Sequence, residues 1–275
     1  MHKRIWVMVL GALLLAGCAE EGSTAAGEGG GSDGCQISSP PVLEGGVLTV
    51  ATDRPAYPPW FEGKPKSYSG YEGEVATEIA ERMDLDIKWV VEPFAKSYAP
   101  GNKDYDFDIN QVTITPERER AVDFSEGYFD NNQGVIALKD NPAAQATSID
   151  DLKSVQLGAQ VGTTALSFIN EIVQPAEDPK IYDTTNDAKS ALDSGQIDAF
   201  VTDVVTTVYL RDFEIDNSVV LGQYPEEEQF GLVFEQGSPL RSCVNQVLSD
   251  MKEDGTLEQL QEEWLQDYLK VPTLS

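Results

Sequence analysis

One arginine of the chain stands in a segment that could bind an anion. The sequence Thr113-Ile-Thr-Pro-Glu-Arg118 predicts a helix start, because threonine is a good N-cap and proline a good first helical residue. A helix N-terminus carries partial positive charge, so Arg118 in the first turn is unfavourable unless an anion lies nearby. The local sequence allows two candidates for this anion. One is Glu117, in a surface salt bridge with Arg118, and the other is a bound ligand.

Two later segments carry hydroxyl and carboxylate groups at positions that suit a ligand. The sequence Gly162-Thr163-Thr164 predicts a second helix start, where threonine hydroxyls and free N–H groups make an anion site. Asp203 follows a predicted strand, at the carboxyl end where open α/β sheets bind ligands. Threonine and aspartate are also common helix N-caps, so each segment has a purely structural alternative.

Aromatic residues follow the first predicted strand. Asp53 precedes Tyr57-Pro-Pro-Trp60, a rigid loop that presents two rings beside the end of the strand. Such rings can cover an aliphatic stem or stack on a planar group of a ligand. Packing of Tyr57 and Trp60 into the core of their own domain is the alternative.

Short β-type runs alternate with helical runs, which predicts an α/β fold with largely parallel sheets. The predicted strands are residues 47–51, 87–91, 107–112, 155–159 and 197–201. The predicted helices are residues 74–83, 165–173 and 187–192, followed by two helices between 239 and 269 that are divided near Gly255. Gly195 is placed to follow the C-terminus of the helix at 187–192.

Two extended segments indicate how these elements divide into domains. Residues 133–138 and 229–234 have a complete α/β unit between them, which fits one lobe inserted into another through paired crossover strands. Two core strands of one continuous sheet would give the same pattern. The roughly 225 residues of the folded part exceed one typical domain, which favours two lobes. We expect lobe 1 at 45–133 and 230–275, and lobe 2 at 134–229.

The chain begins like an export signal. Lys3 and Arg4 precede an apolar run at 5–16 that is too short to span a membrane, since a transmembrane helix needs roughly 20 apolar residues. We therefore expect residues 1–17 to be a signal peptide. The stretch 18–44 is mostly Gly, Ser, Ala and Glu without a period, which predicts a flexible tether.

Composition excludes several classes of site. The single histidine, His2, falls in the predicted signal, so the mature chain would lack a His-based triad, general base or zinc site. The mature chain would also carry 17 Lys and Arg against 47 Asp and Glu, and so acidic a surface repels phosphate backbones. We expect no nucleic acid partner, no metal and no cofactor.

Two cysteines remain beyond Cys18. In an exported protein the even pair Cys35 and Cys243 suggests a disulfide, which would attach the N-terminal segment to the C-terminal helical region. Two unpaired buried thiols are the alternative.

The order of these motifs carries a resemblance that each motif alone does not. The motifs, in chain order, are Tyr57-Pro-Pro-Trp60, Gly70-Tyr-Glu72, Thr113-Ile-Thr-Pro-Glu-Arg118, Val122-Asp-Phe-Ser125, Gly162-Thr-Thr164, Gly195-Gln-Ile-Asp-Ala199 with Asp203, and Asp254-Gly-Thr256. Over residues 47–268 this series resembles the family 3 extracellular solute-binding proteins that serve polar amino acid ABC importers. Leu15-Ala-Gly-Cys18 resembles the lipobox of bacterial lipoproteins. The resemblance implies a two-lobe periplasmic-binding-protein-like fold (type II), with lobes joined by two crossover strands.

The resemblance also implies roles for the residues of the site. Arg118 and Thr164, from different lobes, would bind the α-carboxylate of a free amino acid, and Asp203 would receive its α-ammonium. Thr113 would supply a hydroxyl or backbone contact. The walls around the ligand side chain would be formed by Tyr57, Trp60 and Phe94.

Three residues leave the identity of the amino acid open. Asp53 suits a basic side chain but can equally cap its own loop, and Gln111 suits a polar or acidic ligand. Asn110 and Gln111 stand where many family members have small residues. The resemblance implies a monomeric binding protein, not an enzyme. It would be anchored through Cys18 to the outer face of the cell membrane and would deliver its ligand to the permease of an ABC importer.

Two other functions remain open at this point. A dehydratase-like enzyme on the same fold would need a general acid in the cleft, for which Glu62, Glu72 and Asp53 are candidates. A sensory lipoprotein would bind the same ligand without feeding transport.

Overall fold

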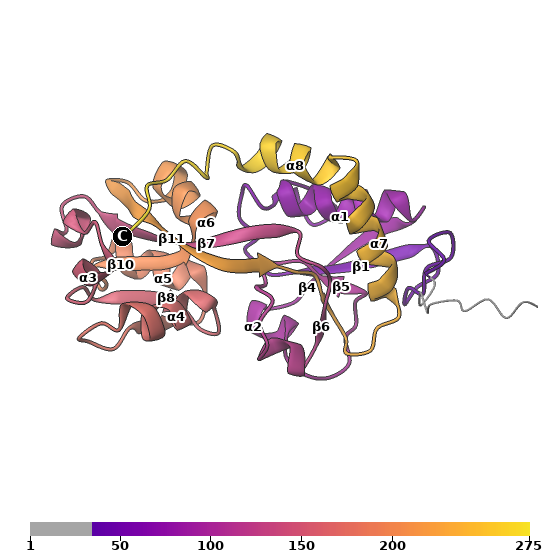
Figure 1. Cartoon of the computed structure of the whole chain (residues 1–275), viewed down its shortest axis with the longest axis horizontal. Helices are drawn as coiled ribbons and strands as arrows, with labels where there is room; N and C mark the ends of the chain where they lie inside the picture. Colours follow the sequence, from indigo (N-terminus) through magenta and orange to yellow (C-terminus); the bar gives the residue numbers. More distant parts are fainter. Residues whose placement is uncertain (1–34) are drawn as a thin grey trace, which may run out of the picture. The chain divides into compact units, whose positions relative to one another are not determined.

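A computed structural model describes residues 35–275. The predicted signal peptide, Cys18 and the predicted tether as far as residue 34 lie outside the described residues. Within residues 35–275, two five-stranded sheets with their helices form two α/β lobes (Figure 1). No helix in this part of the chain combines the length and apolar character that crossing a membrane requires.

The first lobe is built on a mixed sheet with the strand order β4-β1-β5-β12-β6. Its strands are β1 (Val47–Thr52), β4 (Asp86–Val91), β5 (Phe107–Asp108), β6 (Asp123–Phe124) and β12 (Val233–Phe234). β1 runs parallel to β4 and β5, whereas β12 runs antiparallel to β5 and β6. A hairpin of β2 (Glu62–Lys64) and β3 (Ser67–Ser69) stands apart from this sheet.

Three helices pack together in this lobe: α1 (Tyr71–Arg82), α7 (Leu240–Glu253) and α8 (Thr256–Leu265). In α1, Val75 and Ile79 lie one turn apart and share a hydrophobic core with β1. Glu72 and Glu74 in its first turn and Arg82 in its last complement the helix dipole. A short α2 (Phe94–Ser97) and a 3₁₀ turn at Arg118–Arg120 complete the lobe.

The second lobe has the strand order β11-β7-β10-β8-β9. Its strands are β7 (Phe129–Leu138), β8 (Leu157–Gln160), β9 (Lys180–Tyr182), β10 (Ala199–Asp203) and β11 (Ser218–Phe230). Its helices are α3 (Ile149–Leu152), α4 (Thr164–Phe168), α5 (Thr185–Asp193) and α6 (Val204–Tyr209), with a 3₁₀ turn at Pro142–Gln145. Wider π-helical turns, Ile169–Val173 and Leu210–Glu214, extend α4 and α6.

The strands β7 and β11 pair antiparallel and connect the two lobes (Figure 1). At one end of the pair, Phe129 lies opposite Phe230, and both are buried in the core of the first lobe. Further along β7, Val135 and Ala137 belong to a core of the second lobe. The two-lobe fold with paired crossover strands is therefore confirmed.

Most predicted elements are present, and the exceptions are the length of one strand and the direction of several others. Gly195 follows α5 with φ +70°, as expected of a glycine after a helix C-terminus. The strand predicted at 107–112 ends after Asp108, and Gln111 has φ +49°, which no strand residue adopts. The sheets are mixed rather than largely parallel, because β7, β11 and β12 all pair antiparallel.

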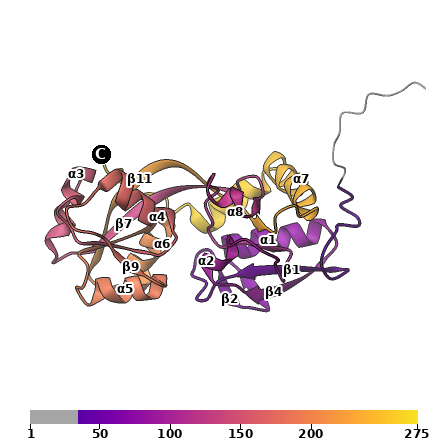
Figure 2. The same cartoon turned by 90° about the horizontal axis from the view of Figure 1, so that it is seen from below.

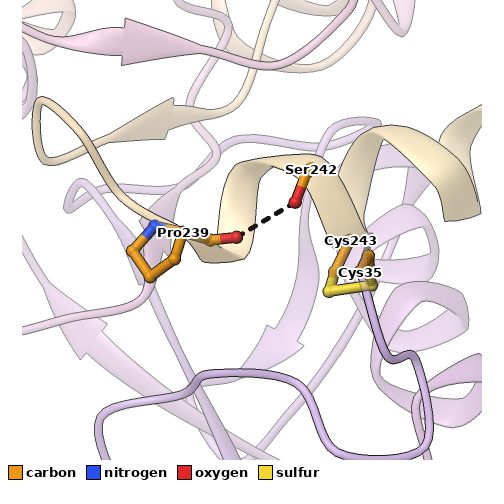
Figure 3. The surroundings of a disulfide bond; sticks show 4 residues. All are labelled: Cys35, Pro239, Ser242 and Cys243. Atoms are coloured by element: carbon orange, nitrogen blue, oxygen red, sulfur yellow. Dashed lines mark hydrogen bonds between the residues drawn. A yellow bond between two sulfur atoms is a disulfide. The ribbon is translucent and has the colours of Figure 1, made fainter. Parts of the chain in front are cut away.

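The N-terminal end of the described chain is attached to the first lobe. Cys35 is disulfide-bonded to Cys243, which lies in α7 (Figure 3). The carboxylate of Asp106 accepts hydrogen bonds from the backbone N–H groups of Leu43 (2.8 Å) and Thr49 (2.7 Å). Residues 35–44, the last part of the stretch predicted as a tether, thus have fixed contacts with the folded lobe.

The C-terminal residues form a further link between the lobes. After α8, the chain crosses to the second lobe, where Thr273 forms a parallel bridge with Gln223 of β11 (yellow, ending at the label C in Figures 1 and 2). Leu274 is 3% exposed and belongs to a core of that lobe. We call residues 266–275 the C-terminal strap.

Candidate functional site

A cavity lies between the lobes, where strands of both sheets end. Its volume is about 80 Å³, whereas one water molecule needs roughly 10–15 Å³. Its wall is formed by residues after β1 and β5, residues at or after the ends of β8 and β10, and residues of the crossover strands. Ten of the eleven predicted ligand residues line it: Asp53, Tyr57, Phe94, Asn110, Gln111, Thr113, Arg118, Thr163, Thr164 and Asp203.

Arg118 is buried at this cavity, with 7% of its surface exposed. Its Nη1 donates to the carbonyl of Thr113 at 2.6 Å, and its Nη2 donates to the carbonyl of Gly162 at 2.9 Å. The guanidinium lies over the rings of Tyr98 and Phe94, 4.5 and 5.7 Å from their centroids. Burial lowers the pKa of Arg118, because it disfavours the charged form.

No described carboxylate forms a salt bridge with Arg118, so the surface ion pair with Glu117 is not formed. The predicted helix at Thr115 is reduced to a single 3₁₀ turn, in which the Thr115 hydroxyl accepts from Arg118 N at 3.2 Å. A buried guanidinium held only by carbonyls and aromatic rings retains donors for a carboxylate.

Gly162 connects the second lobe to this arginine. Its carbonyl accepts hydrogen bonds from Arg118 and from the hydroxyl of Tyr98 at 3.1 Å, and both donors belong to the first lobe. The backbone of Gly162 has φ +74°, and a Cβ at this position would lie 2.2 Å from the Tyr98 hydroxyl oxygen. Only glycine permits this close approach.

The two threonines after Gly162 have different roles. Thr163 is the N-cap of α4, since its hydroxyl accepts from Leu166 N at 3.3 Å, as the structural alternative predicts. The hydroxyl of Thr164 lies 3.3 Å from that of Thr113 across the lobes and accepts from Gln133 Nε2 at 3.1 Å. The loop of Arg118 and the start of α4 therefore meet at one point of the cavity.

Asp203 combines both roles considered for it. Its Oδ1 accepts from Thr206 N at 2.7 Å as the N-cap of α6, and its side chain also lines the cavity. Burial raises the pKa of Asp203, although hydrogen bonds from Thr206 and Thr202 oppose the shift. The cavity thus has a guanidinium from the first lobe and a carboxylate from the second.

The predicted aromatic wall is only partly correct. Tyr57 lines the cavity and its hydroxyl donates to Asn186 Oδ1 of the second lobe, and Phe94 lines it beside Arg118. Trp60 does not line it. Trp60 is fully buried, with edge contacts to the rings of Phe129 and Phe230, and its Nε1 donates to Thr206 Oγ1 at 3.2 Å. The alternative of core packing holds for Trp60 because the crossover strands bring these rings against it.

Asp53 holds two loops together. Its Oδ1 accepts from Arg54 N at 2.6 Å, and its Oδ2 accepts from Phe94 N at 3.0 Å. Both carboxylate oxygens therefore have backbone partners, as expected if Asp53 caps its own loop.

Gln111 lies in front of a buried carboxyl. Its backbone N–H donates to Glu72 Oε1 at 2.8 Å, and its Nε2 donates to Glu72 Oε2. The hydroxyl of Tyr128 also donates to Glu72 Oε1. Burial raises the pKa of Glu72 from 4.5 to about 7, although these hydrogen bonds favour the charged form. Glu72 itself does not line the cavity, so it acts there through Gln111.

Two buried amides of β7, Asn131 and Gln133, also line the cavity, although no sequence motif singled them out. Gln133 Nε2 donates to Glu228 Oε2 at 2.8 Å, and Asn131 Nδ2 donates to the same oxygen at 3.0 Å. Their signal was available, because polar residues two apart at the start of an apolar strand share one face. Among residues 35–275, no three His, Cys, Asp or Glu side chains are grouped as a metal site.

A family model and two curated relatives match most of this chain. A family model described as bacterial extracellular solute-binding proteins, family 3, matches residues 48–267. The chain is 30% identical over 226 residues to the L-cystine-binding protein TcyJ of Escherichia coli (strain K12), which covers 81% of this chain and 84% of TcyJ. It is 34% identical over 230 residues to the putative ABC transporter arginine-binding protein 2 of the same strain, covering 80% and 91% of the two chains.

A solved structure has the same fold. The ancestral amino acid-binding protein AncCDT-1, described as a precursor of cyclohexadienyl dehydratase, matches with a TM-score of 0.68 and 30% identity. The match covers 80% of this chain and 96% of the other.

Proposed function

The chain belongs to the bacterial extracellular solute-binding proteins of family 3, and on that premise we propose that it is the substrate-binding component of an ABC importer. Its ligand is a free amino acid, the kind of ligand named for its relatives. The observation that carries the proposal is the pair of opposite charges at one cavity. Arg118 lines it with no carboxylate partner among the described residues, and Asp203 lines it from the other lobe.

The geometry supports one orientation of the ligand. The α-carboxylate would take the guanidinium donors of Arg118 and the hydroxyl of Thr164, which would turn from its 3.3 Å hydrogen bond to Glu228 Oε2. Thr113 would add a further contact. The α-ammonium would pair with Asp203. Charge-assisted hydrogen bonds contribute roughly 1.5–3 kcal/mol each, so a few of them reach the ~8 kcal/mol of a micromolar affinity.

The proposed lobes are residues 45–133 with 230–275, and residues 134–229, except that the C-terminal strap at the end of the first set packs on the second lobe. Because Arg118 and Asp203 belong to different lobes, all ligand contacts form together only when the lobes are closed. A ligand that bridges them stabilises the closed arrangement, which a permease can distinguish from the open one. The contacts from Arg118 to Gly162 and from Trp60 to Thr206 already cross between the lobes.

A thermal-shift screen of the purified protein against the common amino acids tests this function. A ligand at 100 times its dissociation constant adds about 2.7 kcal/mol of stability, which raises the melting temperature by several degrees. At least one amino acid should do so, and calorimetry should give one site per chain. If no amino acid shifts the melting temperature, the proposal is wrong.

We extend the proposal to the location of the protein. Residues 1–17 act as a signal peptide, Cys18 carries the lipid that holds the protein at the outer face of the cell membrane, and residues 18–34 serve as a tether. The bond between Cys35 and Cys243 forms after export, and the protein acts as a monomer. Cys18→Ser should release the protein from the membrane fraction, and retention of this variant would contradict the anchor.

The three candidate carboxyl groups do not supply the general acid that a dehydratase needs. Asp53 lines the cavity, but both of its carboxylate oxygens accept backbone hydrogen bonds. Glu72 is shielded by Gln111, and Glu62 lies on the exposed hairpin β2–β3. None of these three carboxyl groups is both free and at the cavity. We therefore propose a binding protein rather than an enzyme, and turnover of prephenate by the purified protein would contradict this.

A further inference from the structure

Three buried amides at the cavity have an atom without a hydrogen-bond partner among the described residues. These atoms are Nδ2 of Asn110, Oδ1 of Asn131 and Oε1 of Gln133. The three residues are 7%, 2% and 1% exposed, and all three line the cavity. A buried polar atom without a partner is costly, so these atoms indicate groups that a ligand supplies.

The position of Gln133 assigns it to the head group of the ligand. Its backbone lies directly opposite Asp203 in the pairing of β7 with β10. Its Nε2 donates to the hydroxyl of Thr164, which faces Thr113. Gln133 therefore lies between the proposed carboxylate and ammonium contacts, and its Oε1 is an acceptor for the α-ammonium.

One donor and one acceptor then remain for the ligand side chain. Asn110 offers Nδ2 as the donor, and Asn131 offers Oδ1 as the acceptor. A carboxamide matches this pair, because its oxygen accepts one hydrogen bond and its NH₂ group donates others. A carboxylate would leave the Asn131 acceptor unpaired, and an ammonium would leave the Asn110 donor unpaired.

Apart from Asp203, the carboxylates at or beside the cavity already have partners in the protein. Glu228, which does not line it, accepts from both Asn131 Nδ2 and Gln133 Nε2. Besides Arg118 and Asp203, the lining residues with ionic side chains are Asp53 and Arg54, which are neighbours of opposite sign. Asp53 is already paired to two backbone N–H groups, and Arg54 is exposed. The buried carboxyl of Glu72 receives both donors of Gln111, so that amide separates it from the cavity.

We infer that this cavity is selective for an amino acid whose side chain ends in an uncharged carboxamide, with Asn110 and Asn131 as the residues that determine the selectivity. The inference rests on the proposed function and narrows its ligand class. According to this inference, the unpaired atoms of the two asparagines contact the side chain of the ligand and not its α-amino acid head group.

The test compares ligands of similar size by isothermal titration calorimetry of the full protein. Glutamine or asparagine should bind at least about tenfold more tightly than glutamate, lysine, arginine and methionine, since each unpaired buried group costs roughly a factor of ten or more. Tightest binding by a charged or apolar amino acid, or by cystine, overturns the inference and leaves the proposed function standing. Binding of no amino acid overturns both.

Variants separate recognition of the side chain from recognition of the head group. Asn110→Ala and Asn131→Ala should each weaken binding of the preferred amide by roughly tenfold, and the ratio of amide affinity to alanine affinity should fall in both. Asn110→Asp keeps the shape but replaces the donor with an acceptor, and should lower amide binding while raising lysine binding. The control is Asn102→Ala, an exposed asparagine outside the cavity, which should change nothing. Equal loss for glutamine and alanine in the Asn110 variants would contradict the assigned role.

Discussion

Arg118 is stabilised by groups that leave its charge unneutralised. Two carbonyl oxygens accept from its Nη atoms and two aromatic rings cover its plane, but none of these carries a negative charge. A buried guanidinium without a salt bridge is costly, and in the proposed function the carboxylate of the ligand would offset this cost. The side chain is therefore arranged for binding rather than for stability of the fold.

Replacing Arg118 should abolish binding but not folding. Arg118→Ala removes a buried charge that forms no salt bridge with a described carboxylate, and the loss of its hydrogen bonds to two carbonyls opposes that gain, so we expect stability within about 1 kcal/mol of the wild type. Affinity for the preferred amino acid should fall by a factor of roughly 100 or more, since losing one side of a buried ion pair costs ~2–5 kcal/mol. Calorimetry measures this loss, with Arg120→Ala, an exposed arginine of the same turn, as the control.

Asp203 permits a substitution that separates its two roles. Asparagine caps helices about as well as aspartate, so Asp203→Asn should keep the hydrogen bond from Thr206 N and the melting temperature. It removes the negative charge, and affinity should fall by roughly 30-fold or more. Asp193→Asn, at an exposed position of α5, is the matched control. Undiminished binding by Asp203→Asn would mean that the ammonium lies elsewhere.

Glu72 makes stability depend on pH in a defined direction. Its pKa is raised from 4.5 to about 7 in the folded protein, so the folded state holds the proton more tightly than the unfolded chain. Its contribution to stability is complete below about pH 4.5 and is lost as the pH rises to about 7.

The measurement is urea unfolding of the wild type and Glu72→Gln at pH 5, 6, 7 and 8. Other carboxyl groups, including Asp108 and Asp203, also have raised pKa values because of burial, so the difference between the two proteins is the quantity to follow. Relative to the variant, the wild type should lose stability between pH 5 and pH 8. A difference that does not change with pH would show that Glu72 titrates normally.

At the scale of elements, the sequence predicts regular segments well and irregular ones poorly. Helix α1 follows from the spacing of Val75 and Ile79, and β1 and β4 from their β-branched runs. The sequence predicts a strand over residues 107–112, whereas β5 ends at Asp108. The tertiary contact of Gln111 with Glu72 overrides the predicted strand and turns the backbone to φ +49°.

The site shows the same division between local and non-local signals. Motifs at strand ends and helix starts marked Arg118, Thr164 and Asp203 as candidates, the family resemblance gave them roles at a ligand, and all three line the cavity. The position of Trp60 depends on Phe129 and Phe230, which are distant in sequence and reach it only through the crossover strands. Such packing has no signal in a local window, so the same motif put Tyr57 in the wall correctly and Trp60 wrongly.

The turn before α4 is an element whose fit between the lobes can be tested. In Gly162→Ala the new Cβ would overlap the hydroxyl oxygen of Tyr98, which is 2.2 Å away, while the next ring atom is at 3.5 Å. The closed arrangement should become less favourable, and affinity should fall by roughly 10- to 100-fold. Adding Tyr98→Phe removes the overlapping oxygen and should restore part of the affinity. Equal affinities of the single and double variants would locate the effect in the backbone of residue 162 alone.

At the scale of the molecule, the lobes are connected by more than the two crossover strands. The C-terminal strap carries the chain from α8 of the first lobe to β11 of the second. There, Gln223 N donates to Pro272 O and Leu274 N donates to Gln223 O, each at 2.8 Å. Both cysteines of the Cys35–Cys243 disulfide belong to the first lobe. The disulfide therefore does not connect the two lobes.

Leu274 is the residue through which the strap contributes to stability. Its side chain is 3% exposed in a core of the second lobe, and it approaches Gly222 so closely that a Cβ there would lie 2.8 Å from its Cγ. Leu274→Ala removes this packing, and a buried leucine truncated to alanine typically costs about 2–5 kcal/mol, less where the chain end can relax. We expect a loss near 2 kcal/mol in denaturant unfolding, whereas Leu43→Ala, a leucine 64% exposed, should lose less than about 0.5 kcal/mol.

If the Leu274→Ala and Leu43→Ala variants are equally stable, the strap does not hold the second lobe. A loss confined to Leu274→Ala, with an unchanged m-value, would mean that the strap unfolds together with the lobe it reaches, so that the first lobe stabilises the second through its own C-terminus.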